Sequence, residues 1–253
     1  MSFEVAADAY QAFMGRYADP LADRLMSILA PTSGQRALDV GAGSGAVASR
    51  LAHFLGEAAV SAVDPSPPFV AALRTSLPNA DVRLASAESL PFADVTFDLV
   101  IAQLVVQFMT DAARGLTEMV RVTRPGGRVA VSVWDFSGGR SPLSLFWQAA
   151  GELFDDVPDE SGQLGTKSGE LARLLDAAGL SLVTDTEVAV DLVYDSFESW
   201  WQPYELGVGP AGAYFSTLDS AGREELRQRC AQRLPSAPGP HHAVAWLAIG
   251  VRS

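Results

Sequence analysis

The chain has 253 residues and a net charge of −12, with 18 lysine and arginine residues against 30 aspartate and glutamate residues. This acidic balance, with no basic cluster, argues against a nucleic-acid surface or an anionic membrane as partner. The lone Cys230 excludes an intrachain disulfide, as is typical of a reducing compartment. The chain opens without a basic segment followed by an apolar core, and no apolar run has the length of a membrane span. We therefore expect a cytoplasmic protein.

Residues 1–33 predict an N-terminal helical arm. Apolar side chains recur there at spacings of three and four, with a break near Gly15. Most of these side chains are expected to pack on a sheet. Tyr10, Arg16 and Tyr17 lie at the break, where a lid over a ligand would bend, so they are candidates for contact with a cofactor.

A strand, a glycine turn and a helix are expected in succession after the arm. The apolar run at 36–40 contains Asp39 and breaks into alternating glycines, and helix-forming residues follow at 45–55. The glycines are Gly41, Gly43 and Gly45. Such a turn lets backbone N–H groups approach a small ligand closely.

A second acidic residue closes the next predicted strand. The apolar run at 59–63 ends on Asp64. A carboxylate at this strand end suits the two hydroxyl groups of a ribose. Together with the glycine turn, it indicates a site for a nucleoside cofactor.

The rest of the chain alternates strand-like and helix-like segments. Strands are expected at 79–84, 97–102, 128–133 and 244–251, with one or two more within 180–193. Helices are expected at 67–77, 111–122, 141–154 and 168–178, and in pieces over 197–234 with an interruption at 207–212. This alternation predicts a parallel sheet joined by helical crossovers.

The glycine spacing separates two kinds of cofactor site. A dinucleotide fingerprint, G-x-G-x-x-G, would need a glycine where Ala46 stands. A short-chain dehydrogenase would also place a tyrosine four residues before Lys167, where this chain has Gln163. A nucleotide-dependent oxidoreductase is therefore the less favoured alternative.

Four motifs in order resemble those of class I S-adenosylmethionine-dependent methyltransferases. They are Leu38-Asp-Val-Gly-Ala-Gly-Ser-Gly45, Ala62-Val-Asp-Pro-Ser66, Ser86-Ala-Glu-Ser-Leu-Pro-Phe92 followed by Phe97-Asp98, and Arg124-Pro-Gly-Gly-Arg128. The resemblance covers roughly residues 36–134. Three further segments resemble an uncharacterised branch of small-molecule enzymes in this family: Met14-Gly-Arg-Tyr17, Val133-Trp-Asp-Phe136 and Trp200-Trp-Gln-Pro203.

The resemblance implies an α/β fold with a seven-stranded Rossmann-like sheet, mostly parallel, whose last strand is antiparallel. The whole chain, 1–253, would be a single domain with helical lid insertions at 135–166 and 196–239. These insertions contain six aromatic residues of interest: Phe146, Trp147, Trp200, Trp201, Tyr204 and Phe215. An aromatic lid suits a flat or apolar small molecule, whereas the alternative is that these side chains form core.

The resemblance also assigns cofactor contacts residue by residue. The loop of Gly41, Ala42, Gly43 and Gly45 would lie against the methionine and ribose moieties, and Asp39 would orient the loop or the amino group. The remaining candidates are Asp64 for the ribose hydroxyls, Pro65 or Ser66 beside the adenine, Ala87 for the adenine edge, and Gln103 for the methionine part or the methyl group. Ser86 stands where the family often has an acid, so Ser86 or neighbouring Glu88 would meet the adenine amine.

The catalytic candidates follow from the antiparallel last strand, whose beginning would lie at the cofactor edge of the sheet. His241 and His242 are there candidates for a general base, with Asp135 as the runner-up and Gln103 beside the methyl group. No residues have the spacing of metal ligands, so no metal is expected. The sequence thus predicts methyl transfer from S-adenosyl-L-methionine to a small aromatic or apolar molecule. The alternative of a different class is a protein that binds the cofactor without catalysis.

Overall fold

The computed structural model of the chain describes residues 11–158, 160–234 and 239–253. Over this part the strands form a seven-stranded sheet of order β3-β2-β1-β4-β5-β7-β6. The strands are β1 (Ala37–Val40), β2 (Val60–Asp64), β3 (Asp81–Leu84), β4 (Phe97–Gln103), β5 (Thr123–Trp134), β6 (Ser181–Tyr194) and β7 (Gly239–Val251). The first five run parallel, and β7 is antiparallel to both β5 and β6. The predicted mostly parallel sheet with an antiparallel last strand is confirmed.

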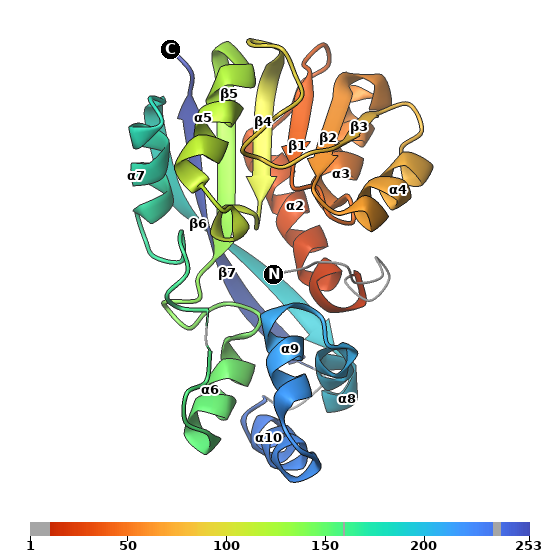
Figure 1. Ribbon diagram of the computed structural model, residues 1–253, viewed down its shortest axis with the longest axis vertical. Helices are drawn as coiled ribbons and strands as arrows, with labels where there is room; N and C mark the ends of the chain where they lie inside the picture. The colour runs from red at the N-terminus through yellow and green to blue at the C-terminus, as the bar shows by residue number, and fades with distance from the viewer. Residues whose placement is uncertain (1–10, 159, 235–238) are drawn as a thin grey trace.

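Helices cover both faces of the sheet (Figure 1). The helical elements are η1 (Gln11–Gly15), α2 (Arg16–Leu29), α3 (Ala46–Leu55), η2 (Glu57–Ala59), α4 (Pro67–Ser76), η3 (Val106–Phe108), α5 (Ala112–Val122), α6 (Ser144–Leu153), α7 (Glu170–Ala177), α8 (Phe197–Trp201), η4 (Gln202–Leu206), α9 (Gly209–Thr217) and α10 (Ser220–Arg233). Alternate residues of β4 enter opposite cores: Ile101 packs with α2, α3 and α4, and Val100 with α5 and α7. Because both faces are buried, the central strands are mostly apolar.

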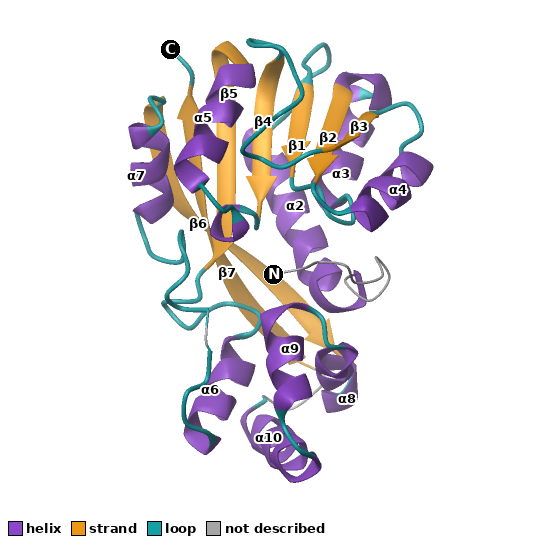
Figure 2. Ribbon diagram, in the orientation of Figure 1, coloured by secondary structure: helices purple, strands orange, loops and turns teal. Residues whose placement is uncertain are grey.

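Strands β6 and β7 continue past the end of β5 as a two-stranded ribbon. The pairing of β5 with β7 stops at Trp134 and Ala245, whereas that of β6 with β7 continues to Tyr194 and Gly239. Figure 2 shows this ribbon leaving the sheet beyond the ends of β1 and β4. The ribbon together with α6, α8, η4, α9 and α10 forms what we term the helical lobe.

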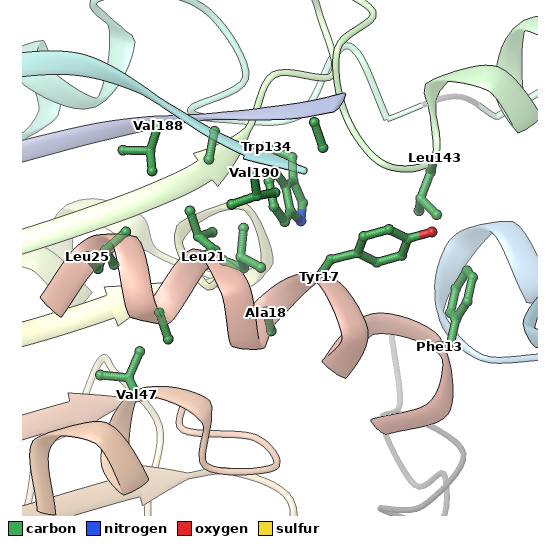
Figure 3. Packing of buried hydrophobic residues seen from close by; sticks show 14 of the residues in the cluster. Phe13, Tyr17, Ala18, Leu21, Leu25, Val47, Trp134, Leu143, Val188 and Val190 are labelled. Atoms are coloured by element: carbon green, nitrogen blue, oxygen red, sulfur yellow. The ribbon is translucent and has the colours of Figure 1, made fainter. Parts of the chain in front are cut away.

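The apolar core of the helical lobe is continuous with the core on one face of the sheet. One cluster of buried side chains runs from α2 and α3 to the aromatic residues of the lobe. Figure 3 shows the junction, where Phe13, Tyr17 and Trp134 lie between α2 and the lobe. The lobe is therefore anchored by a shared core.

The aromatic residues of the two insertions mostly pack on one another. Phe146 stacks on Tyr204 with ring centroids 4.5 Å apart, and both side chains are fully buried, as are Trp200 and Trp201. These residues therefore form core, which was the alternative to an aromatic lid over a small molecule. Stacked and edge-on rings bury large apolar surfaces.

Three boundaries differ from those expected from the sequence. Strand β7 begins at Gly239 instead of residue 244, and helix α9 already begins within the expected interruption, at Gly209. Strand β5 starts at Thr123 instead of residue 128, so it includes the Arg124-Pro-Gly-Gly127 segment. In the described residues no helix combines the length and the apolar character needed to cross a membrane.

Candidate active site

A cavity of about 240 Å³, which we term the main cavity, lies at the carboxyl ends of the parallel strands. Its walls are the glycine loop after β1, the end of β2, residues 86–88 after β3, and the segment from Leu104 to Thr110 after β4. Open parallel sheets bind ligands at this edge, so the topology and the cavity indicate the same place.

The glycine loop and the end of β2 are joined by hydrogen bonds. The Oδ2 atom of Asp64 accepts from the backbone N–H of Gly43, and its Oδ1 atom accepts from that of Ser66, both at 2.8 Å. The N–H groups of Gly41 and Ala42 donate to the carbonyl of Val63. Asp64 therefore fixes both segments and still lines the main cavity.

Gly41 lies where a side chain has no room. Its φ is +70°, and a Cβ atom there would stand 2.5 Å from Cγ2 of Val105. The loop can therefore approach the segment after β4 only because residue 41 is a glycine. Gly45 stands at the N-cap of α3, beside the Leu73 side chain.

Asp39 supports the loop from beneath. Its side chain is 2% exposed, and its Oδ2 atom accepts from the N–H of Ala48 at 2.9 Å in the first turn of α3. Burial raises the pKa of Asp39 from 3.8 to about 7, the hydrogen bond from Ala48 lowers it, and the nearby Asp64 carboxylate raises it. Burial also raises the pKa of Asp64, against the two hydrogen bonds that it accepts.

The raised pKa of Asp39 predicts a pH dependence of stability. The folded chain keeps a proton that the unfolded chain has lost between about pH 4 and about 7, so rising pH destabilises the folded state over this window. We expect Asp39→Asn to remove this loss. Urea unfolding at pH 5 and pH 8 should show the variant gaining stability relative to the parent by about 1–3 kcal/mol between the two pH values. If the difference in stability between the variant and the parent were the same at pH 5 and pH 8, the raised pKa of Asp39 would be contradicted.

Glu88 and Ser86 line the main cavity, as the glycine loop does. The Glu88 carboxylate accepts from the N–H of Thr110 at 2.8 Å and from the Ser86 hydroxyl. Burial alone would raise the pKa of Glu88, but these hydrogen bonds lower it overall. Both alternatives named for the adenine amine thus line one wall of the main cavity, beside Ala87.

The segment after β4 supplies cavity residues that the sequence did not indicate. Leu104 has a φ of +62°, and its N–H donates to the carbonyl of Ser132 at 2.8 Å. The other unpredicted lining residues of this segment are Val105, Phe108, Met109 and Thr110, and one more, Phe69, comes from α4. The sequence signal that could have indicated this segment is an apolar run that continues past the end of β4, before α5 begins.

Two smaller cavities, each of about 30 Å³, adjoin the main cavity at Leu104, which lines all three. The loop cavity lies between Ala18, Asp39, Gln103 and the glycine loop. The lobe cavity lies between η1, the segment after β4, the end of β5 and the start of α9. Gln103 donates to the carbonyl of Ala18 at 3.0 Å and lines the loop cavity together with the glycine loop.

The arm residues take other positions. The Tyr194 hydroxyl donates to that of Tyr17 at 2.5 Å, and Arg16 donates to the carbonyl of Ser199 at 2.7 Å. Within the described part of the chain, Arg16 and Tyr17 join α2 to the helical lobe. Neither lines any of the three cavities. Tyr10 lies outside the described residues.

The expected position of His242 beside the crevice is wrong. Because β7 starts earlier than predicted, His241 and His242 lie in the ribbon, where β7 pairs with β6. The His242 ring is exposed and pairs with Asp191. His241 packs against Tyr194, and burial lowers its pKa, against a hydrogen bond to the Pro142 carbonyl. Neither histidine is among the described residues that line the three cavities.

Asp135 also differs from the expectation that it could act as a base. Its Oδ1 atom accepts from the N–H of Gly138 at 2.8 Å, and its Oδ2 atom accepts from Nε of Arg140 at 2.5 Å. Both oxygens are therefore used to hold the turn that follows β5. No cluster of three metal-ligating side chains occurs in the part of the chain that is described.

Comparison with known proteins decides the family. A model described as a methyltransferase domain matches residues 38–131. An uncharacterized methyltransferase of Mycobacterium tuberculosis is 36% identical over 135 residues, 53% of this chain and 52% of that protein. The ubiquinone/menaquinone biosynthesis C-methyltransferase UbiE of Klebsiella pneumoniae is 32% identical over 175 residues, 66% of this chain and 67% of that protein. This chain belongs to the S-adenosylmethionine-dependent methyltransferase family.

Solved structures show the same fold in this methyltransferase family. A putative methyltransferase from Bacillus halodurans matches with a TM-score of 0.61 and 18% identity, covering 91% of this chain and 98% of that one. The chain spans about half the length of the first curated relatives that it matches. The resemblance drawn from the four motifs is thus confirmed.

S-adenosyl-L-methionine is the cofactor of this methyltransferase family, and the residues present fit it. Gly41 and Gly43 line the main cavity, so the glycine loop presents its backbone to a ligand there. Asp64 also lines this cavity, and Glu88 offers it a second carboxylate acceptor. Such a set of acceptors suits ribose hydroxyls and an adenine amine.

Proposed function

We propose that this chain transfers a methyl group from S-adenosyl-L-methionine to a small apolar or aromatic molecule bound between the sheet edge and the helical lobe. The observation that carries the proposal is the junction at Leu104, which lines the main cavity, the loop cavity and the lobe cavity. A methyl donor bound in the main cavity and the loop cavity would meet, at Leu104, an acceptor bound in the lobe cavity.

Each part of the site would then have a definite task. The cofactor supplies an electrophilic methyl group on a sulfonium. The glycine loop and Asp64 would bind its ribose, Ser86 and Glu88 its adenine, and Gln103 would lie beside its methionine part. The helical lobe would exclude water and orient the acceptor, because a one-step displacement depends mainly on holding two reactants in line.

The nature of the acceptor is supported by the lining of the lobe cavity. Phe13, Leu104, Trp134 and Leu143 make most of its wall apolar. A relative, UbiE, is named for ubiquinone and menaquinone biosynthesis, which agrees with a ring-containing acceptor. The net charge of −12 disfavours polyanionic acceptors.

Calorimetric titration tests the proposed cofactor and distinguishes the alternatives. We expect S-adenosylmethionine and S-adenosylhomocysteine to bind at one site per chain, and NAD to show no heat of binding. Binding of NAD without S-adenosylmethionine would overturn the proposal in favour of an oxidoreductase. Turnover of methyl-labelled cofactor with uncharged quinols and phenols should yield labelled product. Cofactor binding without transfer to any of them would favour the non-catalytic alternative.

A further inference from the structure

The lobe cavity contains three polar side chains in an otherwise apolar lining: Gln107 after β4, Trp134 at the end of β5, and Glu160. Each comes from a different segment, and all of them lie at the junction between the sheet and the helical lobe. The hydrogen-bonding groups of these three side chains therefore bear on what the cavity can bind.

Trp134 and Gln107 each have a buried polar atom without a hydrogen-bond partner among the described residues, Nε1 and Oε1 respectively. Trp134 is 1% exposed, and Figure 3 shows its indole nitrogen on the side of the ring that faces Tyr17. The Gln107 amide is oriented by its other end, because Nε2 donates to the carbonyl of Leu104 at 3.2 Å. The two side chains that carry this donor and this acceptor both line the lobe cavity.

Unpaired buried groups of this kind are unfavourable unless a ligand completes them. An indole N–H can only donate, and an amide oxygen can only accept. A hydroxyl group satisfies both at once, because it accepts one hydrogen bond and donates another. An ether or a carbonyl would satisfy the indole alone.

Glu160 restricts the charge of the ligand. Its side chain is 3% exposed, and its Oε2 atom accepts from the indole N–H of Trp147 at 3.0 Å. A ligand carboxylate would bring a second acidic group into the same low-dielectric space, which is unfavourable without a compensating cation. In the lining of this cavity, no lysine, arginine or histidine is found among the described residues.

We propose that Trp134 and Gln107 recognise a hydroxyl group on an uncharged, ring-containing apolar acceptor. This inference rests on the proposed function. The cavity of about 30 Å³ must widen to admit a ring. Met14 is half-buried and Phe108 is 36% exposed, so these two lining side chains can change rotamer without disrupting the core.

The test compares three probes on protein saturated with S-adenosylhomocysteine: 2-naphthol, naphthalene and 2-naphthoate. We expect 2-naphthol to bind about tenfold more tightly than naphthalene and 2-naphthoate to bind most weakly. Trp134→Phe keeps an aromatic ring and removes the N–H, so it should weaken 2-naphthol about tenfold and leave naphthalene unchanged. Gln107→Met should act in the same direction if Trp134→Phe fails to fold.

Trp246→Phe is the matched control, because its indole nitrogen is also buried without a partner among the described residues while Trp246 lies outside the lining of the lobe cavity. It should leave the affinity for 2-naphthol unchanged. Equal binding of 2-naphthol and naphthalene, an unaffected Trp134→Phe protein, tightest binding of 2-naphthoate, or no binding of any probe would overturn the inference. Failure of S-adenosylhomocysteine to bind would instead overturn the proposed function, so the two failures are distinguishable.

Discussion

Asp64→Ala is expected to weaken the binding of S-adenosylhomocysteine by about 100-fold. The carboxylate accepts from the N–H groups of Gly43 and Ser66, and it is the acceptor placed for the ribose hydroxyls. Its loss leaves these donors unpaired and removes one of the hydrogen-bonded links between the loop and the end of β2. Calorimetric titration of the parent and the variant measures the change, and urea unfolding shows how much of it reflects a loss of the fold.

Asp81→Ala provides the matched control for this substitution. Asp81 lies on the neighbouring strand β3, is exposed, and pairs with Arg83 at 2.6 Å on the surface. Exposed ion pairs contribute little, so we expect less than about a twofold change in affinity. If Asp64→Ala changed affinity no more than Asp81→Ala does, the assignment of Asp64 to the cofactor would be wrong.

The sequence was sufficient to predict the sheet and the cofactor edge because their signals are local. The glycine loop and Asp64 each directly follow an apolar run, and parallel strands bring the ends of such runs to one edge. Between β1 and β5, the apolar residues of the strand segments and those of the helix segments recur with different periods. The positions of Asp39, Gly41 and Asp64 therefore follow from their order along the chain.

The acceptor side could not be predicted in the same way because it depends on distant pairing. The ribbon begins at Gly239, before the apolar stretch of β7, and exists because these residues pair with β6, more than forty positions earlier. That pairing turns His242 to the surface. The left-handed backbone of Leu104, a leucine at φ +62°, is likewise imposed by its surroundings, because no local preference favours it.

Gly41→Ala should reduce the free energy of unfolding by about 3 kcal/mol. Two independent effects contribute. A φ of +70° disfavours any residue with a Cβ atom by about 1 kcal/mol. The new methyl group would also lie 2.5 and 2.8 Å from Cγ2 and Cγ1 of Val105, and such overpacking destabilises by about 1–3 kcal/mol. Urea unfolding measures the sum, and titration with S-adenosylhomocysteine should show weaker binding, because the loop and the segment after β4 must separate.

Two further variants separate the effect of the backbone conformation from the effect of crowding by Val105. Gly34 has a φ of +90° and nothing within 4 Å of its would-be Cβ atom, so Gly34→Ala should lose only about 1 kcal/mol. In a Val105→Ala background the two crowding methyl groups are absent, so Gly41→Ala should there also lose about 1 kcal/mol. An equal loss in both backgrounds would show that Val105 does not crowd this position. A coupling of about 2 kcal/mol would instead show that the glycine is required by the close approach of the loop to the segment after β4, the contact that brings the main cavity and the loop cavity together at Leu104.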